Sequence, residues 1–285
     1  MTTPDADLAA AVRAALLEDL GGALDPARDI TTIASVPAAT RGSGRIVARE
    51  SLIVAGTAAA REAFRQVDRS LEWSGVGDGT ALTAGATLAT VTGSARAILT
   101  GERVALNFLQ RLSGVATLTR RCVDEIEGTK AKILDTRKTT PGLRALEKAA
   151  VAAGGGGNHR IGLHDAVLIK DNHVALAGGI AEALRRAAAA GHPPASVIIE
   201  VADGAGALEA VAAGAGRILL DNFTAEQVAD AVRSVAGRAV VECSGGLAPG
   251  RLRPFALAGP DFLSIGSLTH SARAVDIALD LVALA

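Results

Sequence analysis

The chain has 285 residues and a net charge of −1; 49% of its residues are hydrophobic and 2% are aromatic. No uncharged run reaches the ~20 residues that a membrane-spanning helix needs. The balanced charge and the shortage of aromatic side chains argue against a nucleic-acid or acidic-membrane partner. The two cysteines match neither a zinc nor a disulfide pattern, and the first residues do not resemble a secretory signal. We therefore expect a cytoplasmic protein in which any preference for anions is local.

The first part of the chain predicts a mixed α+β domain over residues 1–112. Thr3 followed by Pro4 is a typical helix start, because a hydroxyl can cap the helix and proline fits its first turn. This helix should end near Gly21. Apolar periodicity and turn residues predict the other elements, which are a loop at 25–32, strands at 46–54 and 86–91, and helices at 57–67 and 97–112.

From residue 113 onward, apolar runs and helical stretches alternate strictly. Helices are predicted at 143–153, 181–190, 204–213, 225–235 and 272–284. Six apolar runs each end in a charged or small polar residue, namely Asp135, Lys170, Glu200, Asp221, Ser244 and Gly266. Repeated strand–helix units imply a parallel sheet. Since six strands are too few for a complete eight-stranded barrel, we predict an open, incomplete α/β barrel over residues 113–271. The C-terminal helix, about 272–285, would pack back on the N-terminal domain.

Cationic side chains gather where these strands end. They follow two apolar runs and the glycine-rich stretch 154–157, and they are Arg137, Lys138, His159, Arg160 and Lys170. The carboxyl ends of parallel strands lie on one face, so these groups should converge. Two cations about 5 Å apart repel by roughly 3 kcal/mol at an effective dielectric near 20, so the cluster implies an anionic ligand. Arg144 and Lys148 instead flank Glu147 on a helix, and we expect both to be solvated surface groups.

Two carboxylates and two glycine loops are also predicted at the carboxyl ends of these strands. Glu200 and Asp221 end buried runs, where they could form a salt bridge and cap a helix, or else hold ribose hydroxyls or Mg²⁺. The loops Ser244-Gly245-Gly246 and Gly266-Ser267 follow the last two strands. Glycine lets backbone N–H groups approach an oxyanion, and the final loops of βα barrels often bind phosphate. We therefore predict a phosphate site there rather than two ordinary turns.

Lys170 has a competing interpretation, because a desolvated lysine at a strand end can form a Schiff base. Glu200 and Asp221 would oppose this by favouring the charged ammonium. Schiff-base chemistry would also leave the two glycine loops without a function. We therefore disfavour it.

Several segments of the sequence resemble those of the quinolinate phosphoribosyltransferases, also called carboxylating nicotinate-nucleotide pyrophosphorylases. They are GER at 101–103, TRKTTPGLR at 136–144, GGGGNHRIGL at 154–163, DAVLIKDNH at 165–173, ECSGG at 242–246 and SIGSLTHS at 264–271. The resemblance implies a type II phosphoribosyltransferase fold. It also implies transfer of phosphoribose from phosphoribosyl pyrophosphate to quinolinate with loss of carbon dioxide. The products are nicotinate mononucleotide and pyrophosphate, in de novo NAD biosynthesis, with magnesium required.

The same resemblance implies a role for each matching residue. The catalytic residues would be Lys138, Lys170, Glu200 and Asp221, and the last two would hold magnesium directly or through water. The substrate would be bound by Arg103, Thr136, Arg137, His159, Arg160, Ser244, Gly245, Gly246, Gly266, Ser267 and His270. Within this set, Arg137, His159 and Arg160 would hold the quinolinate carboxylates. Arg103 would reach into the site of a neighbouring subunit, which implies a homodimer or an assembly of dimers.

Two alternatives stay open. The chain could be a paralogue that takes nicotinate or another carboxylated heterocycle, although three groups placed around two carboxylates disfavour a mono-acid. It could also be a non-catalytic anion-binding relative, although such a protein has no need of Glu200 and Asp221. The segment 21–28 is longer than the corresponding link in many family members, which leaves its local geometry open.

Overall fold

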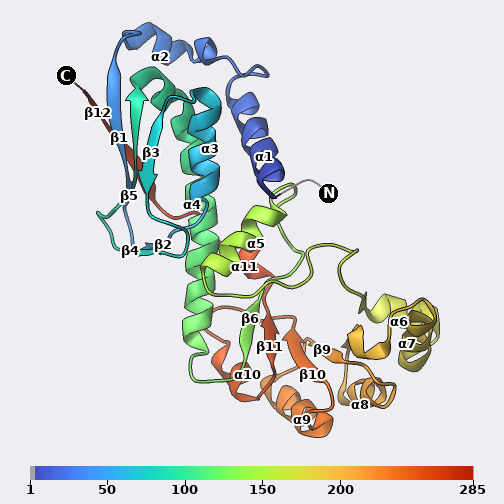
Figure 1. The fold of residues 1–285 in the computed structure, drawn as a ribbon. Helices are drawn as coiled ribbons and strands as arrows, with labels where there is room; N and C mark the ends of the chain where they lie inside the picture. Colours follow the sequence, from blue (N-terminus) through green and yellow to red (C-terminus); the bar gives the residue numbers. More distant parts are fainter. Residues whose placement is uncertain (1–3, 285) are drawn as a thin grey trace. The chain divides into compact units, whose positions relative to one another are not determined.

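The computed structural model describes residues 4–284, and the chain forms two compact units. Unit 1 consists of Met1–Arg120, Thr139–Gly155 and Ser271–Ala285, and unit 2 consists of Arg121–Lys138 and Gly156–His270. Helix α4 (Ala95–Glu125) contributes residues to both units (Figure 1). The predicted domain boundary between residues 112 and 113 falls inside this helix and stays a prediction.

Unit 1 contains a four-stranded antiparallel sheet in the order β12-β1-β5-β3. Its strands are β1 (Arg41–Ala48), β3 (Glu72–Gly75), β5 (Thr87–Ser94) and β12 (Ile277–Ala283), and a separate pair joins β2 (Leu52–Ile53) to β4 (Ala81–Leu82). The strands predicted at 46–54 and 86–91 are confirmed, with shifted bounds. β1 begins earlier than predicted because its first residues, Arg41 to Gly44, carry no apolar signal.

The helices of unit 1 include α1 (Pro4–Asp19), α2 (Ile30–Ser35), α3 (Thr57–Val67) and α5 (Arg144–Ala153). The helices predicted near the N-terminus, at 57–67, from 97 and at 143–153 are confirmed, while Thr3 lies outside the described residues. The predicted loop at 25–32 is wrong. Asp25 caps a 3-10 turn, η1 (Pro26–Arg28), and Asp29 caps α2 by accepting a 3.0 Å hydrogen bond from Thr32 N. Caps of this kind begin short helices that apolar periodicity does not reveal.

The C-terminal helix predicted at 272–285 is also wrong, because residues 277–283 form strand β12. β12 pairs with β1 over seven residues, from Ala48 opposite Ile277 to Gly42 opposite Ala283 (Figure 1). The apolar residues Ile277, Leu279 and Leu281 alternate with their neighbours, as a strand requires. Strand pairing therefore overrides the helix propensity of the alanine-rich segment.

Unit 2 contains a six-stranded sheet in the order β6-β11-β10-β9-β8-β7, and all of its strands are parallel. The strands are β6 (Lys132–Leu134), β7 (Leu168–Ile169), β8 (Ile198–Val201), β9 (Arg217–Asp221), β10 (Val240–Ser244) and β11 (Phe262–Ser264). All six predicted strands are confirmed. Since β6 and β7 form the two edges of this sheet, the predicted open barrel of six strands is confirmed as well.

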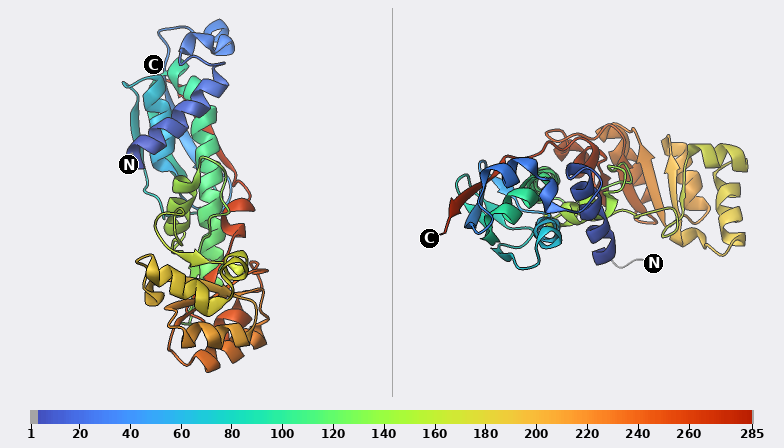
Figure 2. Two further views of the ribbon diagram at one scale, coloured as in Figure 1. Left: turned by 90° about the vertical axis from the view of Figure 1, so that its right-hand side faces the viewer. Right: turned by 90° about the horizontal axis from the view of Figure 1, so that it is seen from above.

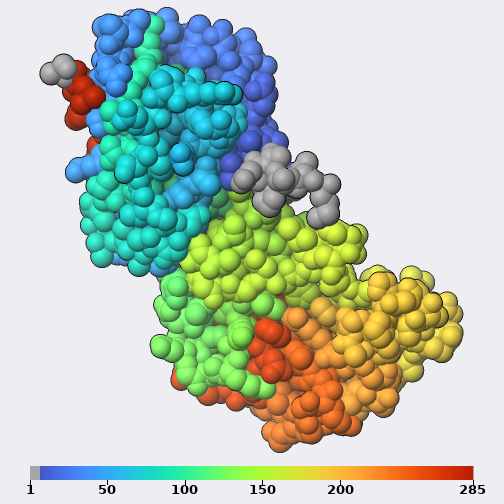
Figure 3. Space-filling model, viewed as in Figure 1, coloured from blue at the N-terminus to red at the C-terminus, as the bar shows by residue number. Residues whose placement is uncertain are grey.

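Helices cover the outside of this sheet (Figure 2). They are α7 (Ile180–Ala189), α8 (Gly204–Ala212), α9 (Ala225–Val235) and α10 (Arg253–Leu257), and their outer side chains form part of the surface in Figure 3. The helices predicted at 181–190, 204–213 and 225–235 are confirmed. The short helices α6 (Asp171–Ala177) and α11 (Ser267–His270) were not predicted. Across residues 4–284, every helix is too short or too polar to cross a bilayer.

Gly114 allows α4 to pack closely against the segment that leads to β12. A Cβ atom added at Gly114 would lie 2.0 Å from the backbone oxygen of Arg273. The same segment is held by hydrogen bonds from Val275 N to Gln110 O, at 3.1 Å, and from Gln110 Nε2 to Ile277 O, at 2.8 Å. The close packing of this segment against α4 therefore requires glycine, which has no side chain, at residue 114.

We expect Gly114→Ala to lower the free energy of unfolding of unit 1 by about 2 kcal/mol, because overpacking outweighs the ~1 kcal/mol gain in helix propensity. Urea unfolding followed by fluorescence of Trp73, the single tryptophan, measures this directly. The control is Gly77→Ala, since a Cβ there meets no described atom within 4 Å. Equal midpoints for Gly114→Ala and wild type would contradict the packing argument.

Candidate active site

Four strands of unit 2 place predicted site residues at their carboxyl ends. Lys170 follows β7, Glu200 is the second-last residue of β8, and Asp221 and Ser244 end β9 and β10. Lys170 Nζ donates a 2.5 Å hydrogen bond to Glu200 Oε2, so the salt bridge considered for Glu200 is present. The Lys170 side chain is 47% exposed and the Glu200 side chain is 10% exposed. A half-exposed lysine that pairs with a carboxylate is not the desolvated lysine that a Schiff-base role requires.

Glu200 and Asp221 line one cavity of about 540 Å³, together with Asp171, Asp203 and Glu209. Asp221 does not cap α9, because Thr224 is the N-cap of that helix. Its Oδ2 atom instead accepts a 2.8 Å hydrogen bond from Asn222 Nδ2. Among the described residues, no group of three or more His, Cys, Asp or Glu side chains is arranged to hold a metal. The two carboxylates still fit Mg²⁺ that arrives with a substrate diphosphate, since such ions use one or two carboxylates plus phosphate oxygens.

The loop after β10 requires glycine at residue 245. Gly245 has φ +84°, and an added Cβ would lie 2.7 Å from Asn222 N. Asn222 also has positive φ, at 59°, and its N–H donates to Ser244 O at 2.9 Å. Asn222 thus joins the Asp221 carboxylate to the Ser244–Gly246 loop. Sequence reasoning missed it, although asparagine after a strand end is a known carrier of left-handed backbone.

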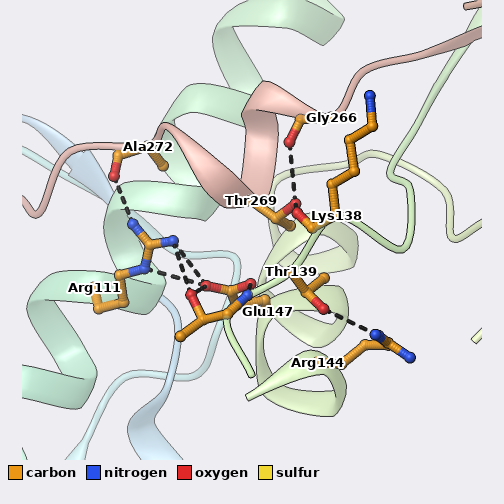
Figure 4. A network of polar contacts seen from close by, with 9 residues as sticks. Arg111, Lys138, Thr139, Arg144, Glu147, Gly266, Thr269 and Ala272 are labelled. Carbon is orange, nitrogen blue, oxygen red and sulfur yellow. Dashed lines mark hydrogen bonds and ion pairs between the residues drawn. The ribbon is translucent and has the colours of Figure 1, made fainter. Parts of the chain in front are cut away.

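The loop after β11 brings Lys138, Gly266 and His270 together. A Cβ at Gly266 would meet Lys138 Cδ at 3.0 Å and His270 Nε2 at 3.2 Å. Thr269 Oγ1 donates to Lys138 O at 2.8 Å and lies 3.2 Å from Gly266 O (Figure 4). Ser267 Oγ is buried and has no hydrogen-bond partner among the residues described. A buried hydroxyl without a partner is costly, so it suits a polar ligand at this loop.

The basic loop 156–160 is anchored to β6 by Asp135. This carboxylate is fully buried; Oδ1 accepts from His159 N at 2.8 Å and Oδ2 accepts from Asn158 Nδ2 at 2.7 Å. Asp135 N donates to Gly157 O at 3.1 Å, and Lys138 N donates to Thr136 Oγ1 at 3.0 Å. Asp135 therefore positions the loop, a role that sequence reasoning did not assign to it.

Arg160 carries an unused donor. Its Nη1 donates to Ala166 O at 3.0 Å, but its Nε is buried and unpaired within the described part of the chain. Burial, and then the positive charge of Arg137, lower the pKa of Arg160, while Asp165 partly opposes them. The repulsion between cations that the sequence predicts is thus present for this pair. An anion would relieve both the unpaired donor and the repulsion.

A buried carboxylate of β10, that of Glu242, contacts the basic loop through His159. Glu242 is fully buried; Arg217 Nε donates to its Oε2 at 2.7 Å, Ser264 Oγ donates to Oε1, and His159 Nε2 lies 3.5 Å from Oε1. Burial alone would raise the pKa of Glu242, but the hydrogen bond from His159 and the charge of Arg217 lower it overall. Sequence reasoning missed Glu242, although a charged residue within the apolar run AVVECS was the signal.

Arg103 belongs to unit 1, so it is not among the groups that the unit 2 sheet brings together. It lines a cavity of about 300 Å³ with Glu18, Asp19 and Asn107. Its predicted role in the site of a neighbouring subunit stays a prediction.

Glu147 and Lys148 are both buried, and Figure 4 shows the contacts of Glu147 with Arg111. Glu147 is fully buried and accepts from Arg111 Nη2 at 2.8 Å and from Thr140 N at 3.0 Å. Lys148 is 4% exposed, so its predicted solvation is wrong. Arg144 Nε donates to Thr139 Oγ1 at 3.0 Å. Buried ion pairs of this kind look like surface pairs in a sequence because both show helical spacing.

The thiols do not serve as nucleophiles. Cys243 is fully buried, and burial, with the charges of Glu242 and Asp221, raises its pKa to about 12. Burial, with the charge of Glu125, raises the pKa of Cys122 to about 12 as well. Both are inert at neutral pH.

Known proteins are similar to this chain in sequence and in fold. The family models described as quinolinate phosphoribosyl transferase, N-terminal domain and C-terminal domain, match residues 29–113 and 115–280. The chain is 47% identical over 277 residues to the nicotinate-nucleotide pyrophosphorylase (carboxylating) of Mycobacterium leprae, with 95% of each chain covered. It is 43% identical over 236 residues to a probable enzyme of the same name from Bacillus subtilis, with 82% of each covered. The crystal structure of NadC from Streptococcus pyogenes has 38% identity and a TM-score of 0.92, over 100% of this chain and 99% of that chain.

Proposed function

Because the chain belongs to the quinolinate phosphoribosyl transferase family, we propose that it transfers phosphoribose from phosphoribosyl pyrophosphate to quinolinate with loss of carbon dioxide. The products are nicotinate mononucleotide and pyrophosphate, and the reaction belongs to NAD biosynthesis. The observation that carries this proposal is the unpaired, buried Nε of Arg160 beside a second arginine, at the edge of the sheet that also bears two glycine loops. We therefore propose one anion for the basic half of the site, at Arg137 and Arg160, and a second anion for the half formed by the two glycine loops.

Quinolinate supplies the anion for the basic half. Arg137 and Arg160 are proposed to hold its two carboxylates, since a guanidinium binds a carboxylate through paired N–H groups. Thr136, Lys138 and Lys170 are proposed to line the same pocket. Two carboxylates also match the number of arginines, which is why a mono-acid such as nicotinate is the weaker candidate.

Phosphoribosyl pyrophosphate supplies the anions for the glycine-loop half. The residues proposed to bind its phosphate groups are Ser244, Gly245, Gly246, Gly266, Ser267 and His270. The buried Ser267 hydroxyl without a described partner supports this assignment. Glu200 and Asp221 are proposed to hold the ribose hydroxyls and a Mg²⁺ ion, directly or through water, and the ion would offset the charge of the pyrophosphate.

The proposed reaction needs no protein nucleophile, because the pyridine nitrogen attacks the anomeric carbon and the bond to pyrophosphate breaks. Glu200 and Asp221 favour the positive charge that develops at that carbon, and Lys138 and Lys170 favour the negative charge on the leaving group. The pyridinium then accepts the electron pair of the bond to the 2-carboxylate, carbon dioxide leaves, and a proton replaces it on the ring. The protein mainly positions two anions.

We also propose a cytoplasmic homodimer, or an assembly of dimers, in which Arg103 of one subunit enters the site of the other. The GER word at 101–103 supports this through the family resemblance. A surface arginine that enters a neighbouring site gives each site residues from two chains, which is common for isologous dimers.

We expect Arg137→Ala to raise the Kd for quinolinate by about 10- to 100-fold, because a charge-assisted hydrogen bond contributes about 1.5–3 kcal/mol. Titration calorimetry measures the affinity, and the unfolding midpoint should not fall. Arg186→Ala is the control, since Arg186 is 63% exposed and pairs with Glu182 on α7. Unchanged quinolinate affinity in Arg137→Ala would exclude the proposed pocket.

Arg103→Ala and Lys170→Ala should each be inactive alone, and their mixture should recover activity. In a randomly exchanged dimer mixture about a quarter of the sites are intact, if each site takes Arg103 from its neighbour. The measurement is turnover after refolding the two variants together, with subunit exchange followed by native mass spectrometry. Exchange without recovery would rule out a shared site.

A further inference from the structure

The imidazole of His159 is held between protein groups on both sides. Its Nδ1 accepts a 2.7 Å hydrogen bond from Arg160 N, and its Nε2 lies 3.5 Å from Glu242 Oε1. Because Nδ1 is an acceptor, the ring proton must be on Nε2 and point at the carboxylate. The side chain is only 7% exposed. Both ring nitrogens therefore serve the protein, whereas the family resemblance implied that His159 binds quinolinate.

The Glu242 carboxylate, which the His159 imidazole faces, is held in place by several contacts. It projects from the middle of β10, at a residue that pairs in register with Leu219 of β9 and Phe262 of β11. Arg217 holds its Oε2, and the Arg217 guanidinium lies 4.4 Å from the centre of the Phe262 ring. Ser264 holds its Oε1. A buried carboxylate with three partners from three different segments cannot move without losing them.

Arg160 is the group that this arrangement orients. Its backbone N–H is bound to the His159 ring, and its Nη1 is bound to Ala166 O at 3.0 Å. Asp135 holds the other side of the loop through His159 N, at 2.8 Å. With these atoms fixed, the unpaired Nε has one direction in which to donate.

We propose that Glu242 is a positioning residue, which acts through His159 to aim the guanidinium of Arg160 at a quinolinate carboxylate. His159 is then a positioning residue as well. This inference rests on the proposed function, since it assumes that quinolinate is the anion. It deepens that proposal because it separates the groups that touch the anion from the buried relay that orients them.

The electrostatics explain why such a relay is needed. Arg137 repels Arg160, and repulsion of roughly 3 kcal/mol between cations about 5 Å apart would turn an unrestrained arginine toward solvent. A glycine-rich loop has little stiffness of its own to resist this. A misplacement of about 1 Å can cost as much as 10²-fold in rate. The relay replaces the missing stiffness with hydrogen bonds to a strand.

The test is a double-mutant cycle between Glu242→Gln and His159→Asn, with Kd measured separately for quinolinate and for phosphoribosyl pyrophosphate. Asparagine keeps an acceptor near the place of Nδ1 but cannot reach Glu242. We expect each single variant to raise the Kd for quinolinate by about 10- to 100-fold and to leave the Kd for phosphoribosyl pyrophosphate unchanged. Because the two residues act in series, the double variant should be no weaker than the weaker single variant.

Val241→Ala is the matched control for a loosened β10. Val241 is adjacent to Glu242, is 3% exposed and projects from the opposite side of the strand. If Val241→Ala weakens quinolinate as much as Glu242→Gln does, the effect is structural and the proposal is overturned. If Glu242→Gln does not fold, Ser264→Ala takes its place in the cycle, since it removes a hydrogen bond to Glu242 but no charge.

Additive losses in the cycle would overturn the proposal, because they would mean that His159 and Glu242 act independently. Unchanged quinolinate affinity in a folded Glu242→Gln protein, or in Ser264→Ala where that variant replaces it, would overturn it too. Wild-type protein without affinity for quinolinate would instead overturn the proposed function, and this inference with it. Quinolinate binding by the wild type therefore separates the two failures.

Discussion

The structure of unit 2 depends on keeping two cations, Arg137 and Arg160, close together at the carboxyl ends of its strands. Repulsion of a few kcal/mol per pair is a large part of the 5–15 kcal/mol by which a typical domain is stable. Two carboxylates offset it from behind, because Asp135 and Glu242 are both fully buried next to the basic loop. Asp135 binds the backbone N–H of His159 and the side-chain amide of Asn158, and Glu242 lies against the His159 imidazole. Both leave the Nε donor of Arg160 available. The two buried carboxylates thus stabilise the basic loop and leave the Arg160 guanidinium able to bind an anion.

The two halves of this edge use different chemistry for the anions that we propose they bind. One half presents guanidinium and ammonium groups, which suit the planar carboxylates of a small aromatic acid. The other half presents glycine loops, in which Gly245 lies so close to Asn222 that no side chain fits. Close backbone approach suits phosphate oxygens, whose charge is spread over several atoms. In the sheet order, Asp221 on β9 and Glu200 on β8 lie between the glycine loop of β10 and Lys170 after β7, and we propose that the sugar of phosphoribosyl pyrophosphate lies along these two strands.

Much of the fold could be predicted because the strands of unit 2 are short, buried apolar runs that each stop at a polar residue. The residue that ends β9, Asp221, and the one that follows β7, Lys170, were visible in this way. The C-terminal strand could not be predicted from propensity, since its partner β1 lies more than two hundred residues earlier in the chain. The residues behind the site, Glu242 and Asp135, were missed as functional groups because their roles depend on contacts between segments distant in sequence. His159 was found, but only the structure shows that its ring nitrogens face other protein groups.

The central claim is that quinolinate loses its 2-carboxylate in a reaction that requires phosphoribosyl pyrophosphate. The most direct measurement uses quinolinate labelled with ¹³C in that carboxylate, incubated with the protein, magnesium and phosphoribosyl pyrophosphate, and followed by NMR. The account predicts labelled carbon dioxide and unlabelled nicotinate mononucleotide in equal amounts, and no carbon dioxide when phosphoribosyl pyrophosphate is omitted. Mononucleotide formed from nicotinate but not from quinolinate, or binding of quinolinate without any product, would contradict it.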